Sequence, residues 1–207
     1  NAFSCDIKEC RKGTPSSFHI VDDLTPYLKG KTAFHTQDGT YKQVPRWHLI
    51  IAHPPCTYLC KVSSVRMVQG GQLNEERYAK MLEARDFFYK CLGASAPFVA
   101  VENPLPMARA NLPQPSCFVH PSWYGHKYTK KTLYWLRNLP PLMPQIIFPN
   151  PKEFVRASRG HYRSRTLPGV AKAMAEQWGN YILDEMNNLT HHRCKSSQSF
   201  KGTTKEK

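Results

Sequence analysis

The chain has 207 residues, of which 41% are hydrophobic and 12% aromatic, a composition that excludes a disordered protein and fits one domain of ordinary size. Lys and Arg number 29 against 15 Asp and Glu, and the formal net charge of +14 predicts an anionic partner, most simply nucleic acid. The longest apolar runs, 49–52 and 98–101, are much shorter than the roughly 18 residues of a membrane-spanning helix, so no membrane association is expected.

Short strands are expected in the first half of the chain. The segments 2–5, 18–21 and 47–52 are apolar and rich in residues that favour strands, and a polar residue follows each of them. Residues 29–46 contain two glycines and a proline, which predicts an exposed loop.

A helix is predicted from Asn74 to Leu92. Asn74 is a suitable N-cap, and the acidic residues 75 and 76 lie in the first turn, where the helix dipole favours them. One apolar stripe has helical spacing: Tyr78, Met81, Leu82, Phe88, Tyr89 and Leu92. A strand at 98–102 follows. The order strand, helix, strand predicts an α/β fold with a parallel sheet and crossover helices.

The second half changes in character. Residues 104–168 are proline-rich and expected to be largely irregular, with short strands at 132–136 and 146–148. A final helix is predicted over 170–186, with a buried face made of Val170, Met174, Trp178, Tyr181 and Ile182. Residues 191–207 are polar and basic and are expected to form a disordered tail. We therefore expect a single domain over 1–190.

Candidate functional residues follow the predicted strands, because open parallel sheets bind ligands beyond the carboxyl ends of their strands. Asp6 and Asp22 end two consecutive strands, and such acids suit the hydroxyl and amine groups of a nucleoside cofactor. The alternative is that each one caps the turn that follows it.

Cys56 and Glu102 are the strongest catalytic candidates. Cys56 follows Pro54 and Pro55, which fix the direction of the backbone directly after a buried strand, so a thiol nucleophile is expected at the edge of the sheet. Glu102 ends the apolar strand 98–102, where burial raises a carboxyl pKa and suits it to deliver a proton. The alternatives are a buried thiol that only packs and a carboxyl that only holds a loop.

The sequence Ile-Ile-Ala-His-Pro-Pro-Cys (50–56), with Val-Glu-Asn-Pro at 101–104, resembles the cytosine-5 DNA methyltransferases, in particular the compact type found in phages. The segments 123–136, 139–142 and 164–179 also resemble these compact members. The resemblance implies a Rossmann-like methyltransferase sheet, in which Cys56 attacks a cytosine and Glu102 is the acid that grips it. It also implies S-adenosyl-L-methionine as cofactor, double- or single-stranded DNA as partner, and the cytoplasm of a bacterial or phage-infected cell.

The same resemblance implies roles for further residues. It implies cofactor contacts by Asp6, Asp22 and Pro54. Substrate contacts are expected from Pro55, Asn103, Lys130, Lys131, Arg163 and Arg165. The first strand of the family and its Gly-rich cofactor loop have no counterpart, and Thr57 replaces the family's Gln. A trimmed front end is therefore expected, and a nucleic-acid-binding remnant without catalysis is an alternative.

A basic and aromatic stretch supports a nucleic-acid substrate. Residues 127–165 contain nine Lys and Arg and one acid, interleaved with aromatic residues that can stack on an unpaired base. The alternative is a solvated basic face above core aromatics, and at least one of Tyr134 and Trp135 is expected in the core.

Two other enzyme classes share parts of this pattern. A zinc nucleobase deaminase needs Pro-Cys-Xaa-Xaa-Cys and His-Xaa-Glu; the chain has Cys56 and Cys60 four apart and no His-Xaa-Glu, so no metal is expected. An amino-group methyltransferase carries an aromatic residue after two prolines, and Cys56 stands there instead. The position of the transferred methyl group, on carbon or on nitrogen, separates this class from the cytosine-5 enzymes.

Overall fold

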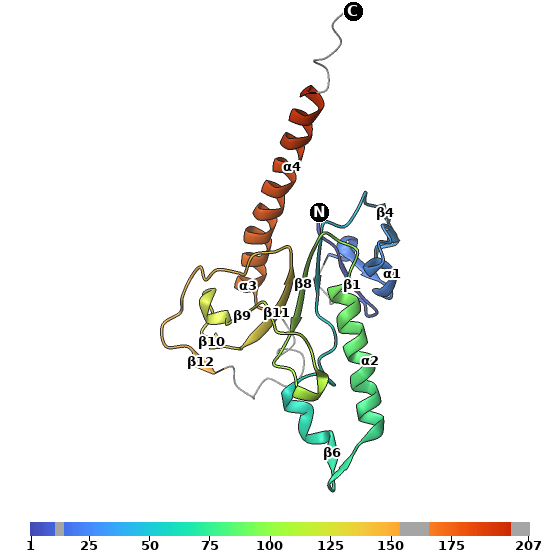
Figure 1. Ribbon diagram of the computed structural model, residues 1–207, viewed down its shortest axis with the longest axis vertical. Coiled ribbons are helices and arrows are strands. Elements are labelled where there is room, and N and C mark those ends of the chain that lie inside the picture. Colours follow the sequence, from blue (N-terminus) through green and yellow to red (C-terminus); the bar gives the residue numbers. More distant parts are fainter. Residues whose placement is uncertain (11–14, 154–165, 200–207) are drawn as a thin grey trace, which may run out of the picture. The chain divides into compact units, whose positions relative to one another are not determined.

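The computed structural model describes residues 1–10, 15–153 and 166–199 (Figure 1). Within it the chain divides into two compact units. Unit 1 comprises residues 1–119 and 131–141, and unit 2 comprises 120–130 and 142–207. The boundary at residue 120 falls within the proline-rich stretch.

A mixed four-stranded sheet is the centre of unit 1. Its strand order is β5 (Leu49–Ala52), β8 (Phe98–Asn103), β11 (Thr132–Arg137) and β9 (Cys117–Val119). β5 and β8 are parallel, as the sequence predicts, whereas β11 runs antiparallel to both of its neighbours. No α-helix separates β9 from β11, and consecutive strands without a crossover pair antiparallel. The α/β class is confirmed; a wholly parallel sheet is not.

The helix α2 (Glu75–Leu92) connects β5 to β8 and lies beside the sheet (Figure 1). Asn74 caps it by accepting a hydrogen bond from the Arg77 amide at 3.0 Å, as predicted. Met81 and Phe88 are fully buried in the core, but Tyr89, predicted on the same stripe, is 44% exposed, and Cys91 is buried instead. The predicted apolar stripe is therefore confirmed except at Tyr89, since Tyr78, Leu82 and Leu92 are partly buried against the core.

The first strands pair separately from the main sheet. β1 (Ser4–Asp6) and β2 (His19–Val21) form a parallel two-stranded sheet, with η1 (Ser16–Phe18) before β2 and α1 (Thr25–Leu28) after it. β3 (Ala33–His35) and β4 (Tyr41–Gln43) form a hairpin within 29–46, where a loop was predicted. The loop prediction is wrong because Phe34 is buried, packing against Tyr27 and Trp47.

Short elements surround the ends of β5 and β8. They are η2 (Lys61–Arg66), the hairpin of β6 (Val68–Gln69) and β7 (Gln72–Leu73), and η3 (Ala108–Ala110).

Unit 2 contains a long helical segment near its C-terminal end. It consists of α3 (Pro168–Ala173), a π-helical turn η6 (Met174–Trp178) and α4 (Gly179–Ser199). The predicted helix is confirmed, but it continues through residues 191–199, where a disordered tail was predicted. Residues 180–199 contain no glycine or proline to end a helix. Residues 200–207 of that tail lie outside the described residues.

The rest of unit 2 has little regular structure. It contains η4 (Pro121–Trp123) and a short parallel pair, β10 (Tyr128–Thr129) with β12 (Lys152–Glu153). The predicted strand at 146–148 is wrong: Ile146 makes only an isolated bridge with Tyr124, and this segment is exposed. Among the described residues of both units, no helix is long and apolar enough to cross a membrane.

Candidate active site at the ends of β5 and β8

The candidate site lies where two neighbouring parallel strands, β5 and β8, end. Ala52 of β5 pairs with Val101 of β8, so the residues that follow them, His53 and Glu102, lie next to each other. The residues that carry the resemblance thus come from two loops at one edge of the sheet, although about 45 residues separate them along the chain.

Backbone hydrogen bonds join the two loops. The Lys61 amide donates to the Leu105 carbonyl at 2.7 Å, and the Met107 amide donates to the Leu59 carbonyl, also at 2.7 Å. Cys60 and Pro106 form an antiparallel bridge between them. The segment that follows Cys56 is therefore fixed to the segment that follows Glu102.

The loop that carries Cys56 is stiff. Pro54 is buried and Pro55 exposed, and each proline ring restricts its own backbone. The Cys56 carbonyl then accepts hydrogen bonds from the Leu59 and Cys60 amides, both at 3.0 Å, which closes a tight turn directly after the cysteine. Cys56 itself is half-buried.

Arg77, which the sequence alone did not single out, supports this turn from the first turn of α2. Its guanidinium donates to the Thr57 carbonyl at 3.3 Å and lies over the Tyr58 ring, 5.0 Å from the centroid. The cation is therefore held beside the residue that follows Cys56.

Glu102 has one side-chain partner among the described residues. Its Oε2 lies 3.0 Å from Nδ1 of His53, and the two side chains are 16% and 42% exposed, respectively. The sequence placed His53 in the motif that carries the resemblance, but no role was predicted for it. The signal that identifies it is its place one residue beyond the end of β5, which the register sets beside Glu102.

Asn103 lies on the other face of the sheet from Glu102, since side chains alternate along a strand. It is completely buried, and neither its Oδ1 nor its Nδ2 has a hydrogen-bond partner in the structure. Val101, two residues earlier on the same strand, belongs to the hydrophobic core beneath α2. Glu102 and Asn103 were expected to act together on the substrate, and the fold separates their side chains.

Asp6 and Asp22 lie together at the ends of β1 and β2, as expected for consecutive parallel strands. The Asp22 amide donates to the Asp6 carbonyl at 3.2 Å. Oδ2 of Asp22 accepts hydrogen bonds from the Lys31 ammonium at 3.0 Å and the Tyr27 hydroxyl at 2.9 Å. These bonds, the one from Lys31 first, hold the pKa of Asp22 below its ordinary value.

Asp6 is less engaged than Asp22. Its Oδ1 accepts from the Lys8 amide at 3.0 Å, and its side chain is exposed. Of the two acids predicted for the cofactor, Asp6 therefore has the less occupied carboxylate, since Asp22 accepts from Lys31, Tyr27 and the Asp23 amide. No Gly-rich turn joins them among the described residues.

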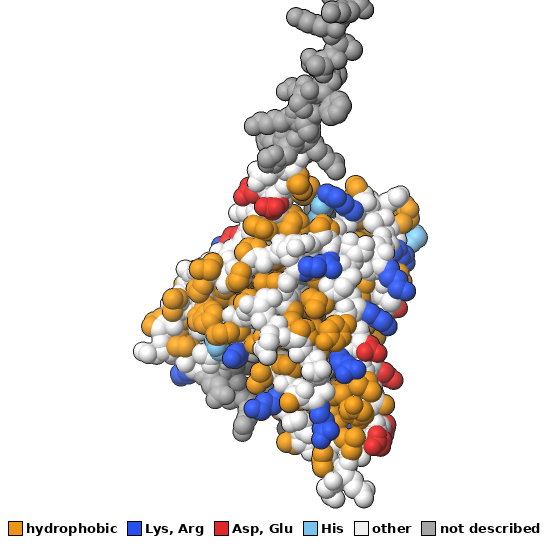
Figure 2. Space-filling view, in the orientation of Figure 1, with side chains coloured by type: hydrophobic (Ala, Val, Ile, Leu, Met, Phe, Trp, Pro, Cys, Tyr) orange, Lys and Arg blue, Asp and Glu red, His pale blue; other side chains and the backbone are white. Residues whose placement is uncertain are grey.

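The basic and aromatic stretch is only partly a surface feature. Tyr124, Tyr134 and Trp135 are at most 4% exposed, so these rings belong to the core and cannot stack on a base. Lys131 of unit 1 lies over the Phe118 ring, 4.6 Å from its centroid. Lys130 belongs to unit 2, and Arg163 and Arg165 lie outside the described residues. On the face shown in Figure 2, Lys and Arg side chains are interspersed with apolar ones.

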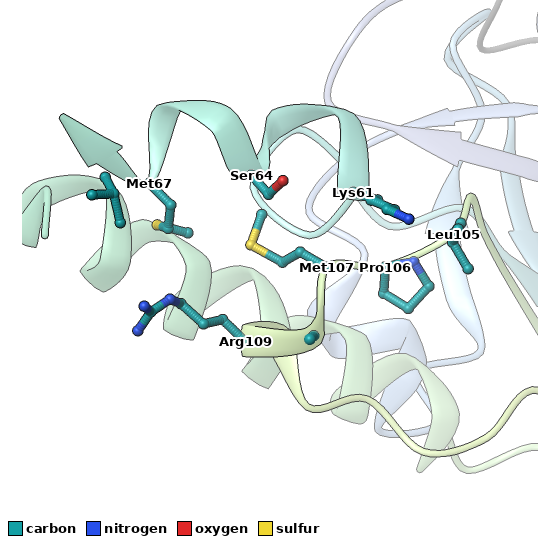
Figure 3. A pocket seen from close by; sticks show the side chains of 9 residues that line it. Lys61, Ser64, Met67, Leu105, Pro106, Met107 and Arg109 are labelled. Atoms are coloured by element: carbon teal, nitrogen blue, oxygen red, sulfur yellow. The ribbon is translucent and has the colours of Figure 1, made fainter. Parts of the chain in front are cut away.

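A cavity of about 500 Å³ adjoins the two joined loops (Figure 3). η2 forms one side and the segment after β8 the other, with apolar walls from Met67, Leu105 and Met107. Lys61 and Arg109 supply positive charge, and no acidic side chain lines it. Cys56 and Glu102 do not line this cavity. The residues that line it follow them in the sequence, within 61–68 and 105–109.

Among the described residues, no group of three or more His, Cys, Asp or Glu is arranged to hold a metal ion. No protein-family model and no curated protein sequence matches this chain.

Proposed function

We propose that the chain is a compact cytosine-5 DNA methyltransferase with a Rossmann-like catalytic sheet, in which Cys56 is the nucleophile and Glu102 the acid. One observation carries the proposal. The parallel pairing of β5 with β8 and the hydrogen bonds between their loops bring the Pro-Pro-Cys turn and the Glu-Asn-Pro turn to one edge of the sheet.

The chemistry requires a cytosine outside the base stack, so that both faces of its ring are accessible. The Cys56 sulfur forms a bond to carbon 6 of the ring, and the negative charge that develops moves toward ring nitrogen 3. Glu102 donates a proton to nitrogen 3 and thereby stabilises this charge; acid catalysis of this kind contributes about 10²- to 10⁴-fold in rate. Once carbon 5 carries the transferred methyl group, a base such as water takes the carbon-5 proton, the Cys56 sulfur leaves as thiolate, and the nitrogen-3 proton returns to Glu102.

S-adenosyl-L-methionine, when bound, supplies the methyl group. Asp6 at the end of β1 fits the nucleoside part of this molecule, with an exposed carboxylate beside the main-chain end of β2. Pro54, which is buried, shapes the backbone of the Cys56 turn.

The cavity beside the loops suits the nucleotides that flank the target. Phosphates would meet Lys61 and Arg109, and the apolar walls suit the face of a base. Val62 and Val65 are 78% and 77% exposed on η2, but they do not line the cavity.

Covalent trapping tests the proposal. DNA in which 5-fluoro-2′-deoxycytidine replaces the target cytosine is expected to remain attached to Cys56 after methyl transfer, because fluorine cannot leave carbon 5 as a proton does. Mass spectrometry of the peptide that contains Cys56 measures the adduct. Cys56→Ser is expected to abolish adduct and methyl transfer while DNA affinity stays within about twofold.

Cys60→Ser is the matched control, since Cys60 is also half-buried and lies in the same turn; it is expected to retain the adduct. Unchanged methyl transfer by Cys56→Ser would reject the mechanism. A methyl group on nitrogen would indicate the amino-group class, and DNA binding without any transfer would indicate a binding remnant.

A further inference from the structure

The contact between His53 and Glu102 has the geometry of a positioning interaction. It joins two side chains that the strand register places next to each other, and its 3.0 Å length is that of a good hydrogen bond between Nδ1 and Oε2. Glu102 is the more buried of the two, so its carboxyl depends on protein groups for its orientation.

The two carboxyl oxygens of Glu102 have different surroundings. Oε2 is hydrogen-bonded to His53, whereas Oε1 has no hydrogen-bond partner among the described residues. One oxygen is therefore held and the other is left to meet a ligand. Without this contact the Glu102 carboxyl would rotate freely about χ3, a torsion angle that has a broad distribution in proteins.

We propose that His53 is a positioning residue for Glu102: its Nδ1–H donates to Oε2 and thereby directs Oε1 toward ring nitrogen 3 of the cytosine. This inference rests on the proposed function. It goes beyond the roles that the resemblance implies, because those roles include no function for His53.

The hydrogen bond from His53 becomes stronger during the proposed step. When sulfur bonds to carbon 6, the proton on Oε1 moves to nitrogen 3 and Glu102 becomes a carboxylate. The Nδ1–H of His53 then donates to a charged acceptor, and such hydrogen bonds are about twice as strong as neutral ones. When the sulfur leaves, the proton returns from nitrogen 3 to Oε1. His53 thus stabilises the charged state more than the resting state, which is the condition for accelerating the step.

A pair of substitutions separates this role from a structural one. His53→Asn places an amide N–H close to the position of Nδ1 and keeps the donor, while His53→Ala removes it. Methyl transfer to cytosine-containing duplex DNA is measured under single-turnover conditions, with DNA affinity and the thermal midpoint measured alongside. His53→Ala is expected to slow transfer about 10- to 100-fold, the effect of losing a hydrogen bond to a charged group. His53→Asn is expected to restore most of this loss, and DNA affinity and thermal midpoint are expected to stay close to those of the wild type.

Combining His53→Ala with Glu102→Gln supplies a second measurement. If His53 acts through Glu102, the double variant is expected to be no slower than Glu102→Gln alone, because interacting groups are not additive. Additive losses would overturn the inference. Equal loss in His53→Ala and His53→Asn, or full activity in His53→Ala, would also overturn it.

The wild-type protein distinguishes this failure from failure of the proposed function. A wild type that transfers no methyl group and forms no adduct with the fluorinated DNA contradicts the proposed function itself. An active wild type together with an equally active His53→Ala contradicts only the role of His53.

Discussion

At the scale of single residues, the thiols of Cys91 and Cys56 differ in their burial. Cys91 is completely buried at the end of α2, and burial raises its pKa from 9.0 to about 12. Cys56 is half-buried at the edge of the sheet, where a ligand can reach it. The pKa of Cys5 is also raised, to about 11, by burial first and then by the charge of Asp22.

The raised pKa of Cys91 predicts a loss of stability at high pH. Above pH 9 the unfolded chain releases a thiol proton that the folded chain keeps, so the free energy of unfolding falls as pH rises. At a pH of about 10.5 the contribution of Cys91 to this loss is about 2 kcal/mol. Urea unfolding at pH values of about 8 and about 10.5 measures it. Cys91→Ala is expected to lose less stability over this range than the wild type, and Cys60→Ala to behave like the wild type. An equal loss in Cys91→Ala and wild type would contradict this account.

The residues of the candidate site could be predicted only where the signal is local in sequence. Cys56 and Glu102 follow apolar strand segments, and their position at strand ends is visible in the sequence. His53 and Arg77 could not be assigned their contacts, because these depend on the register of β5 against β8 and on the distance from α2 to the Cys56 turn. The separation of Asn103 from Glu102 follows from strand alternation, which the motif alone conceals.

At the scale of elements, Arg137 connects β11 to the end of α2. Its guanidinium donates to the carbonyls of Leu92, Ala94 and Ala96, at and just beyond the last turn of the helix. From the sequence, Arg137 was one of the basic residues expected on a nucleic-acid surface. Its hydrogen bonds show that it satisfies main-chain carbonyls instead.

Arg137→Met keeps the length of the side chain and removes these donors. It is expected to lower the free energy of unfolding by about 2 kcal/mol, because the carbonyls lose charged hydrogen bonds. Urea unfolding measures this loss. Arg109→Met, an exposed arginine of the cavity, is the control and is expected to change stability little. Weaker DNA binding by Arg137→Met at unchanged stability would contradict the structural role.

The elements that the sequence predicts correctly are those with a strong periodic pattern, such as α2 and the final helix. The hairpin of β3 and β4 escaped prediction because its stability depends on Phe34 packing against Tyr27 and Trp47, which are not its neighbours along the chain. The segment 146–148 has the composition of a strand, but among the described residues no strand pairs with it along its length.

At the scale of the whole molecule, the net charge of +14 predicts salt-sensitive binding to DNA. Each phosphate contact contributes a slope of roughly −0.9 to the dependence of log affinity on log salt concentration. Fluorescence anisotropy with a labelled duplex, from about 50 to about 200 mM NaCl, measures this slope. Lys61→Ala is expected to reduce its magnitude by about 1, and Lys90→Ala, an exposed residue near the end of α2, to leave it unchanged. An equal slope for Lys61→Ala and the wild type would contradict the proposal that the cavity is part of a DNA-binding surface.

The π-helical turn at Met174–Trp178 determines which side of the last helix is apolar. Val170, Met174, Trp178 and Ile182 are all buried and lie four residues apart, a spacing that drifts by about 40° per step in a regular α-helix. The wider π turn takes up this drift and keeps the four side chains on one side. A π turn holds one residue more than a regular α-helical turn, so deleting one residue within 174–178 would restore regular winding and leave later positions nearly in phase. Ile182 would therefore stay on the buried side. A deletion after the turn, between residues 179 and 181, meets regular α-helix and would rotate Ile182 and every later position by about 100°.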